Sequence, residues 1–236
     1  MISMKRARLE NRIIYMLLTF TICFSCNLKT AEDYYDIAFD LEEKGEYEKA
    51  IPFLDKAIEK KPRFRPALIN RGADKSEIGD YKGAIKDYQK IIAFDPKNTL
   101  VLMNIGNNYK RLKQYNKSIY FYTKALQTKG AIKSDSTYLV INSPNEWDKD
   151  SDYFVRKYKI EFERGISYVY SKKYELAIKD LEQPIKYNYE TPDALSWIGE
   201  SYYHLKDTLN ARKFLTQASK YGLIDAKELL EKMLNE

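Results

Sequence analysis

The chain has 236 residues, of which 44% are hydrophobic and 31% charged, and its formal net charge is +6. This balance supports a folded core and argues against intrinsic disorder, which combines low hydrophobicity with high net charge. Nine glycines and seven prolines exclude collagen-like and low-complexity sequences. Two cysteines and one histidine are too few for a His- or Cys-based metal site or a disulfide scaffold.

The N-terminal segment has the layout of an export signal. Residues 1–12 are polar and basic, and residues 13–24 are almost wholly apolar. The apolar run has 12 residues, well short of the roughly 20 that a membrane-spanning helix needs. A short apolar run behind a basic segment is typical of a secretory signal peptide. We therefore expect residues 1–25 to be a signal peptide.

The run ends in Cys23-Phe24-Ser25-Cys26, which resembles a bacterial lipobox. Ser25 fits the small residue before the lipidated cysteine, whereas Cys23 and Phe24 depart from the usual pattern. The resemblance implies that Cys26 becomes the lipidated N-terminus, that residues 26–30 form a tether, and that the protein is held at a membrane of the bacterial cell envelope, the outer membrane by preference. A plain secretory signal or an uncleaved anchor, with Cys26 incidental, is the alternative.

The rest of the chain repeats itself every 34 residues. From Tyr115 to Tyr174 the step is 59, so the same lattice continues after 25 inserted residues. The matches at this spacing are Gly45 and Gly79; Gly72 and Gly106; Pro62 and Pro96; Tyr47, Tyr81 and Tyr115; Gly165 and Gly199; Ala177 and Ala211.

These residues resemble the tetratricopeptide repeat (TPR) family, whose unit is a 34-residue helix-turn-helix. The resemblance implies an all-α fold, a right-handed α-solenoid of about five TPR repeats with a C-terminal capping helix. Repeats one to three fill residues 31–132 (31–64, 65–98 and 99–132), an insertion fills 133–157, and repeats four and five fill 158–225 (158–191 and 192–225). Residues 226–236 read as an amphipathic cap, with Leu229, Leu230, Met233 and Leu234 covering repeat five.

Certain positions within the repeat carry the packing. Small residues at positions 8 and 20 let the two helices of one unit approach closely, and a tyrosine at position 17 fills the space between units. Position 8 is Ala38, Gly72, Gly106, Gly165 and Gly199; position 20 is Ala50, Ala84, Ser118, Ala177 and Ala211; position 17 is Tyr47, Tyr81, Tyr115 and Tyr174.

The insertion is rich in turn-forming residues, apart from a short β-prone stretch at 138–141. It extends the neighbouring helices or forms a surface loop. Asp148, Asp150 and Asp152 alternate as in a calcium loop, but Tyr153 stands where that loop needs glycine, so we expect no calcium site.

No constellation of catalytic residues is recognisable. The sequence has no phosphate-binding glycine loop and no nucleophile paired with a base, and His204 reads as a surface or groove-edge residue. The best basic cluster, at residues 60–65, includes Pro62 and reads as a solvated turn rather than a nucleic-acid site. We therefore expect a non-enzyme without cofactor, metal or nucleic acid.

Binding is what the resemblance implies, because the first helix of each TPR unit lines a concave groove that holds a protein or peptide segment. Large rings in the second half are the expected anchors, although packing against the insertion or the next repeat would explain them equally well. The candidate groove residues are Tyr35, Phe39, Asn70, Met103 and Asn107 in repeats one to three, and Phe162, Tyr170, Trp197 and Tyr203 in repeats four and five. Of the clamp with which one TPR subtype holds chaperone tails, only Asn70 is matched.

The sequence thus indicates a lipid-anchored TPR scaffold for protein–protein interaction in the bacterial envelope, bound to the membrane through its N-terminal lipid. The alternative is an envelope-assembly factor, similar to the TPR lipoproteins of outer-membrane barrel insertion or pilus secretin assembly. An enzyme or ligand site built around the insertion is a third, weaker hypothesis. No feature of the sequence specifies the partner or an oligomeric state.

Overall fold

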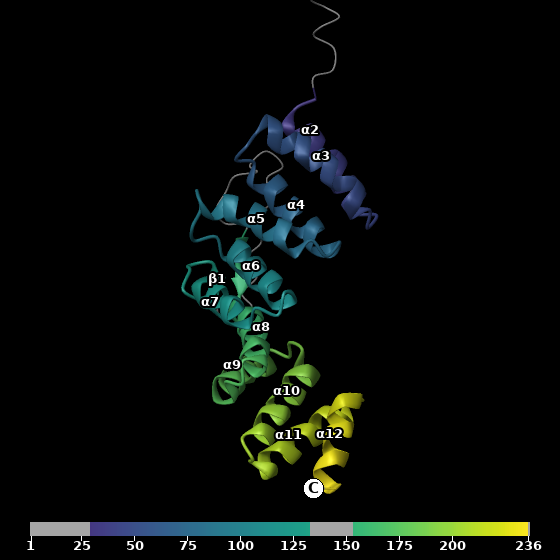
Figure 1. Ribbon diagram of the computed structural model, residues 1–236, viewed down its shortest axis with the longest axis vertical. Coiled ribbons are helices and arrows are strands. Elements are labelled where there is room, and N and C mark those ends of the chain that lie inside the picture. Colours follow the sequence, from purple (N-terminus) through teal and green to yellow (C-terminus); the bar gives the residue numbers. More distant parts are fainter. Residues whose placement is uncertain (1–28, 133–152, 236) are drawn as a thin grey trace, which may run out of the picture.

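The computed structural model describes residues 29–132 and 153–235. The predicted signal peptide, Cys26 and residues 133–152 of the insertion lie outside this range. Ten of the eleven described helices form five helix-turn-helix pairs, and the last helix follows alone (Figure 1). They are α2 (Ala31–Glu42) and α3 (Tyr47–Lys60); α4 (Arg65–Glu77) and α5 (Tyr81–Ile92); α6 (Thr99–Arg111) and α7 (Tyr115–Leu126); α8 (Lys157–Tyr170) and α9 (Tyr174–Lys186); α10 (Thr191–His204) and α11 (Thr208–Lys220); and α12 (Ile224–Asn235).

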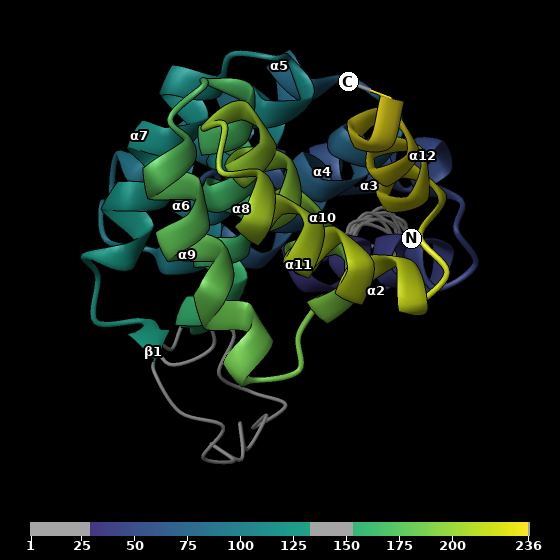
Figure 2. The same ribbon diagram turned by 90° about the horizontal axis from the view of Figure 1, so that it is seen from below.

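The prediction of an α-solenoid is confirmed, with five helix pairs in the order of the five predicted repeats. Helices α8 and α10 each begin one residue before the predicted start of their repeat. Each helix packs on the next along the chain, and the array is elongated, with α2 and α12 toward opposite ends (Figure 1). Seen along its long axis, the array curls instead of stacking in a straight line (Figure 2). No helix in the described ranges combines the length and apolar composition needed to cross a bilayer.

Close contact within each repeat depends on position 8, as predicted. A Cβ placed on Gly72 would lie 2.7 Å from the ring of Tyr88, and one on Gly106 would lie 2.6 Å from Tyr122. Both tyrosines are fully buried, at position 24 of the second helix. Glycine therefore makes room for a large core ring, and the two helices of the repeat close around it.

The turn inside each repeat uses a left-handed residue at position 15. Gly45 and Gly79 occupy it with φ of 72° and 85°. The later repeats place Lys113, Lys172 and Lys206 there, with φ of 57°, 57° and 65°. A non-glycine residue in this region carries a backbone strain of about 1 kcal/mol, so three strained lysines lie along one edge of the array.

Two short strands, which the sequence did not predict, lie just before the insertion and near its end. β1 (Ala131–Ile132) and β2 (Val155–Arg156) run parallel, with Ala131 opposite Val155. The last five residues assigned to the insertion thus belong partly to β2, and α8 begins at residue 157.

The C-terminal helix covers repeat five, but not with all the predicted residues. Met233 and Ala226 are buried against Leu215, and Leu229 and Leu230 are half-buried beside them. Leu234 is 69% exposed, so its predicted role in the cap is wrong. Helix α12 starts at Ile224, two residues before the predicted boundary, and its buried residues are Ala226 and Met233.

Candidate protein-binding groove

The first helices of the repeats form the inner layer of the curl. Successive first helices contact one another, α4 with α6, α6 with α8, and α8 with α10. In a curved array, the layer whose helices approach each other most closely faces the concave side. The groove therefore runs along α2, α4, α6, α8 and α10.

In repeats one and two, two of the predicted groove residues, Tyr35 and Asn70, contact each other, and only Phe39 is largely exposed to solvent. The Asn70 amide donates to the Tyr35 hydroxyl at 3.3 Å and to Oε2 of Glu42 at 2.7 Å. The Tyr35 ring is buried on Phe64, at a centroid distance of 5.4 Å, and burial raises the pKa of Tyr35 to about 12. Tyr35 is thus a core residue, and Asn70 links α4 to α2 through its hydrogen bonds to Tyr35 and Glu42. Phe39 is 46% exposed.

A pair of carboxyl groups lies beside this link. Asp74 is only 2% exposed. Among the described residues, its Oδ2 and Oε1 of Glu42 are both buried, and with both carboxyl groups ionised neither oxygen has a hydrogen-bond donor; one shared proton would join them. Burial, followed by the charge of Glu42, a hydrogen bond to Glu42 and the charge of Glu77, raises the pKa of Asp74 to about 7. Asp74, at position 10 of repeat two, is not among the predicted groove residues.

Between repeats two and three, the groove holds a polar cavity of about 440 Å³. Asn104 and Asn107 line it, with Oδ1 of Asn107 accepting from the Tyr122 hydroxyl at 2.7 Å. Met103, predicted to line the groove, instead packs against the core cluster around Leu102. Since an amide both donates and accepts, such a surface suits the backbone of an extended peptide.

In repeats three to five, three aromatic rings form a row, here called the aromatic row: Tyr115, Tyr170 and Trp197. Tyr170 stacks on Tyr115 at 4.8 Å with 9° between the planes, and Trp197 leans on Tyr170 at 5.6 Å. Tyr170 is 50% exposed. Of the two predicted anchors in this row, Tyr170 is accessible, whereas Trp197 is partly buried against the core of repeat four. Tyr115 fills the space between repeats, as predicted for position 17.

The other two predicted anchors do not join this row. Phe162 is 7% exposed and buried in the core of repeat four, with Tyr189 edge-on at 5.7 Å, so its assignment as an anchor is wrong. Tyr203 is half-buried against the α12 side of the array, with Lys232 over its ring at 5.4 Å. For these two rings the alternative given above, packing against neighbouring parts of the array, is the one that the structure shows.

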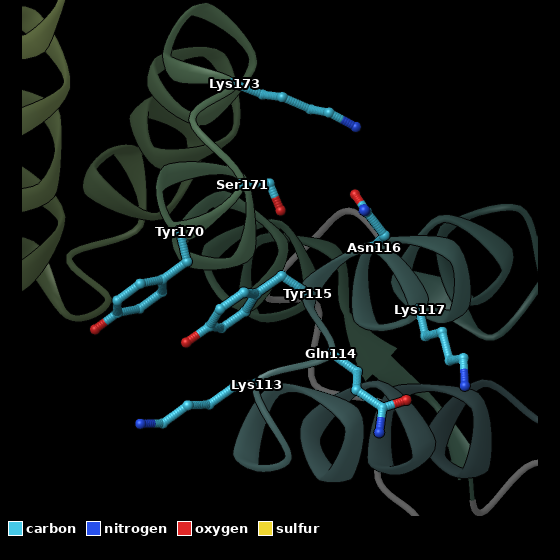
Figure 3. Close-up of a pocket in the computed structure, with 8 residues that line it drawn as sticks. All are labelled: Lys113, Gln114, Tyr115, Asn116, Lys117, Tyr170, Ser171 and Lys173. Carbon is cyan, nitrogen blue, oxygen red and sulfur yellow. The ribbon is translucent and has the colours of Figure 1, made fainter.

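A basic pocket of about 580 Å³ opens beside the aromatic row, where the turns of repeats three and four meet (Figure 3). Figure 3 shows the rings of Tyr115 and Tyr170 side by side at one edge, and Lys173 extending from the turn of repeat four. Lys113 and Lys117 complete the positive lining. The pocket is suited to an anionic group, and the sequence signal for it is the excess of lysine in the two turns.

His204 lies on an exposed edge of repeat five, packed on an aromatic ring. The imidazole stacks on Tyr174 at 4.8 Å, and its Nε2 lies 3.7 Å from Oε1 of Glu200. Among residues 29–132 and 153–235, no three His, Cys, Asp or Glu side chains are grouped to hold a metal ion.

Sequence models described as tetratricopeptide repeat match residues 31–64, 100–131 and 162–220. The chain belongs to the tetratricopeptide repeat family. The matched segments fall in repeats one, three, four and five, as laid out by the 34-residue lattice. TPR arrays are scaffolds for protein–protein interaction and not enzymes, and this chain shares that class.

Solved structures of TPR proteins have the same fold. YrrB, described as a TPR protein with an unusual peptide-binding site, aligns with a TM-score of 0.67 and 18% identity over 90% of this chain and 97% of its own. MamA of Desulfovibrio magneticus RS-1 aligns with a TM-score of 0.65 and 15% identity, over 80% of this chain and 93% of its own. PilF of Pseudomonas aeruginosa aligns with a TM-score of 0.59 and 20% identity, over 80% of this chain and 75% of its own. At these identities the likeness concerns the fold alone. No curated protein matches the sequence.

Proposed function

We propose that this protein is a lipid-anchored TPR scaffold of the bacterial cell envelope, which holds an extended protein segment in its concave groove. The observation that carries the proposal is the aromatic row. Tyr170 and Trp197 come from the inner helices of two repeats; the Tyr170 ring is half-exposed at the groove and leans on Trp197, which is itself partly buried on the core of repeat four. Aromatic rings are typical anchors of protein interfaces, and the structurally similar YrrB is itself described as having a peptide-binding site.

The groove supports a segment of mixed chemistry. Amides in the cavity of repeats two and three suit a peptide backbone, the aromatic row suits an apolar side chain, and the adjacent lysines suit a carboxylate. The aromatic row and the basic pocket together could take either an acyl chain or an aromatic residue followed by an acidic one. We favour the peptide with an aromatic and an acidic residue, since the cavity between repeats two and three is polar.

Membrane attachment rests on the lipobox-like sequence and on the short distance along the chain between Cys26 and helix α2. The Thr30 side chain caps α2 by accepting from the backbone N–H of Asp33 at 3.0 Å, and Asp33 accepts from the N–H of Thr30 at 2.7 Å. This reciprocal cap starts α2 at residue 31. Only a few residues then separate Cys26 from repeat one, so a lipid on Cys26 would hold the array at the bilayer surface.

The test is capture of envelope proteins by the full chain. Tyr170→Ala and Trp197→Ala should lower recovery of the bound protein at least about tenfold per folded molecule, because truncating an anchor typically costs about 2 kcal/mol or more. Tyr120→Ala is the matched control, since Tyr120 is 53% exposed but lies on the second helix α7. Equal recovery with all three variants would contradict the proposal. An envelope-assembly role is its narrower form, and requires altered outer-membrane protein levels in a deletion strain.

A further inference from the structure

Position 10 of the repeat has a fixed task in the second half of the array. Asn108, Ser167 and Ser201 occupy it in repeats three, four and five, and all three are buried. Each donates a hydrogen bond to the backbone carbonyl four residues earlier, at 2.8, 3.0 and 2.7 Å. A buried donor at this place is therefore satisfied within its own helix.

Repeat two breaks this pattern with Asp74. An ionised carboxylate has no hydrogen to donate, so it cannot make the bond that Asn108 makes in the next repeat. Its Oδ2 is left buried without a hydrogen-bond partner within the described residues, and the same holds for Oε1 of Glu42. The second oxygen of Glu42 already accepts from Asn70. Two carboxyl groups thus present unsatisfied oxygens between repeats one and two.

The charged groups around the pair do not neutralise it. The groups near Asp74 are Glu42 on α2, Glu77 on α4 and the neutral hydroxyl of Tyr88 on α5. The nearby cations on α4 are directed elsewhere. Arg71 binds Asp87 and, from α3, Asp55, while Lys75 lies 2.7 Å from Asp87.

Two facing carboxyl groups are stable in a buried place only when they share a proton or bind a cation. The raised pKa of Asp74 is consistent with the first arrangement, a shared proton. The second solution needs a positive group from outside the repeat. Both oxygens are covered, so an incoming cation reaches them by displacing the side chain of Glu42, which is only half-buried and lies on the groove-lining helix α2.

We infer that the Glu42–Asp74 pair is the receptor for a lysine or arginine side chain of the protein segment held in the groove. The incoming cation replaces the shared proton, which leaves to solvent. Both oxygens that lack a partner then gain a charged donor, the strongest kind of hydrogen bond available to them. This inference rests on the proposed function, because it names the chemistry of the same segment at the other end of the groove from the basic pocket.

The test uses a random peptide library selected against the full chain in detergent at pH 8. Bound peptides should carry a lysine or arginine, and replacing it with norleucine or citrulline should weaken binding at least about tenfold. Affinity of the unmodified peptide should rise about tenfold from pH 5.5 to pH 8, as the competing proton is lost. Asp74→Asn should remove this rise and bind at pH 8 as the wild type does at pH 5.5.

Asp40→Asn is the matched control, because Asp40 holds position 10 of repeat one and is exposed. It should bind like the wild type at both pH values. Asp74→Asn is expected to fold, since repeat three carries Asn at the same place, and Glu42→Gln gives a second variant with the same expected loss. Selected peptides without a cation, or unchanged binding by both variants, would overturn the inference and leave the proposed function standing. Selection of no peptide at all would overturn both.

Discussion

Arg164 and Asp180 form a two-pronged ion pair inside repeat four, with Nε and Nη2 donating to the carboxylate at 2.6 and 2.9 Å. Arg71 and Asp87 hold the same positions, 7 and 23, in repeat two, and Nε of Arg71 donates at 2.8 Å. Repeats one, three and five carry isoleucine and phenylalanine there instead: Ile37 and Phe53, Ile105 and Phe121, Ile198 and Phe214. One place in the repeat is thus filled alternately by an apolar and an ionic pair.

Removing one partner of the buried pair should cost more than replacing both. Asp180→Ala leaves the Arg164 guanidinium without its carboxylate, and we expect a loss of about 3 kcal/mol in the free energy of unfolding. The double variant Arg164→Ile with Asp180→Phe installs the pair of the odd repeats and should recover most of the loss. Urea unfolding measures both. An equal loss in the single and the double variant would show that the two kinds of pair are not interchangeable.

Asp74→Asn should make the protein more stable at alkaline pH. The pKa of Asp74 is raised from 3.8 to about 7 in the fold. Between these values the folded state therefore binds more protons than the unfolded state, and stability falls as the pH rises. The variant avoids this loss, so we expect a gain on the order of 2 kcal/mol at pH 8 and little difference at pH 4. Urea unfolding at the two pH values is the measurement, with Asp40→Asn as the control. A gain of the same size at pH 4 would point to a cause other than ionisation.

Gly106→Leu should separate the two helices of repeat three. Even a Cβ would lie 2.6 Å from the ring of Tyr122, which is fully buried and tied to Asn107. Overpacking of this kind commonly costs about 1–3 kcal/mol. Because neighbouring repeats stabilise each other, hydrogen exchange should quicken in repeats two and four as well. Gly79→Ala is an informative comparison, since Gly79 has no neighbour within 4 Å of its Cβ position and only its φ of 85° resists substitution. An unchanged melting temperature of Gly106→Leu would refute the close contact.

Cys26→Ser should abolish lipid attachment. Metabolic labelling with a fatty-acid analogue is expected to mark the wild-type protein and not the variant, and the variant should leave the membrane fraction. The lost anchor would be worth about 0.8 kcal/mol for each buried CH₂ group. Equal labelling of both proteins would disprove lipidation at this residue, with Cys23→Ser serving as the control for the neighbouring thiol.

The repeat boundaries could be predicted because they depend on local features that recur along the chain. Small residues at positions 8 and 20 recur in every unit, whatever the unit packs against. The candidate site was predicted less well. Phe162 and Tyr203 occupy groove positions, but Tyr189 and the α12 side of the array cover them, and such contacts follow from the neighbours of each repeat.

The features missed entirely arise between repeats. Tyr115 and Tyr170 are 55 residues apart, and only stacking of repeats three and four brings them and their lysines to one pocket. In the same way, Glu42 and Asp74 become a pair only where repeat two packs on repeat one. A repeat register locates each residue within its unit, but the chemistry of an interface depends on two units at once.

The strand pair β1–β2 has a consequence for engineering. Val155 donates to the carbonyl of Gly130 at 2.9 Å, and this bond fixes the two ends of the insertion at a single point beside α7 and α8. Since the ends meet there, the packing of α7 on α8 does not depend on how many residues join them, and the entropy of closing a loop grows only slowly with its length. We expect this point to accept a spliced-in reporter domain while the solenoid on either side keeps its pitch.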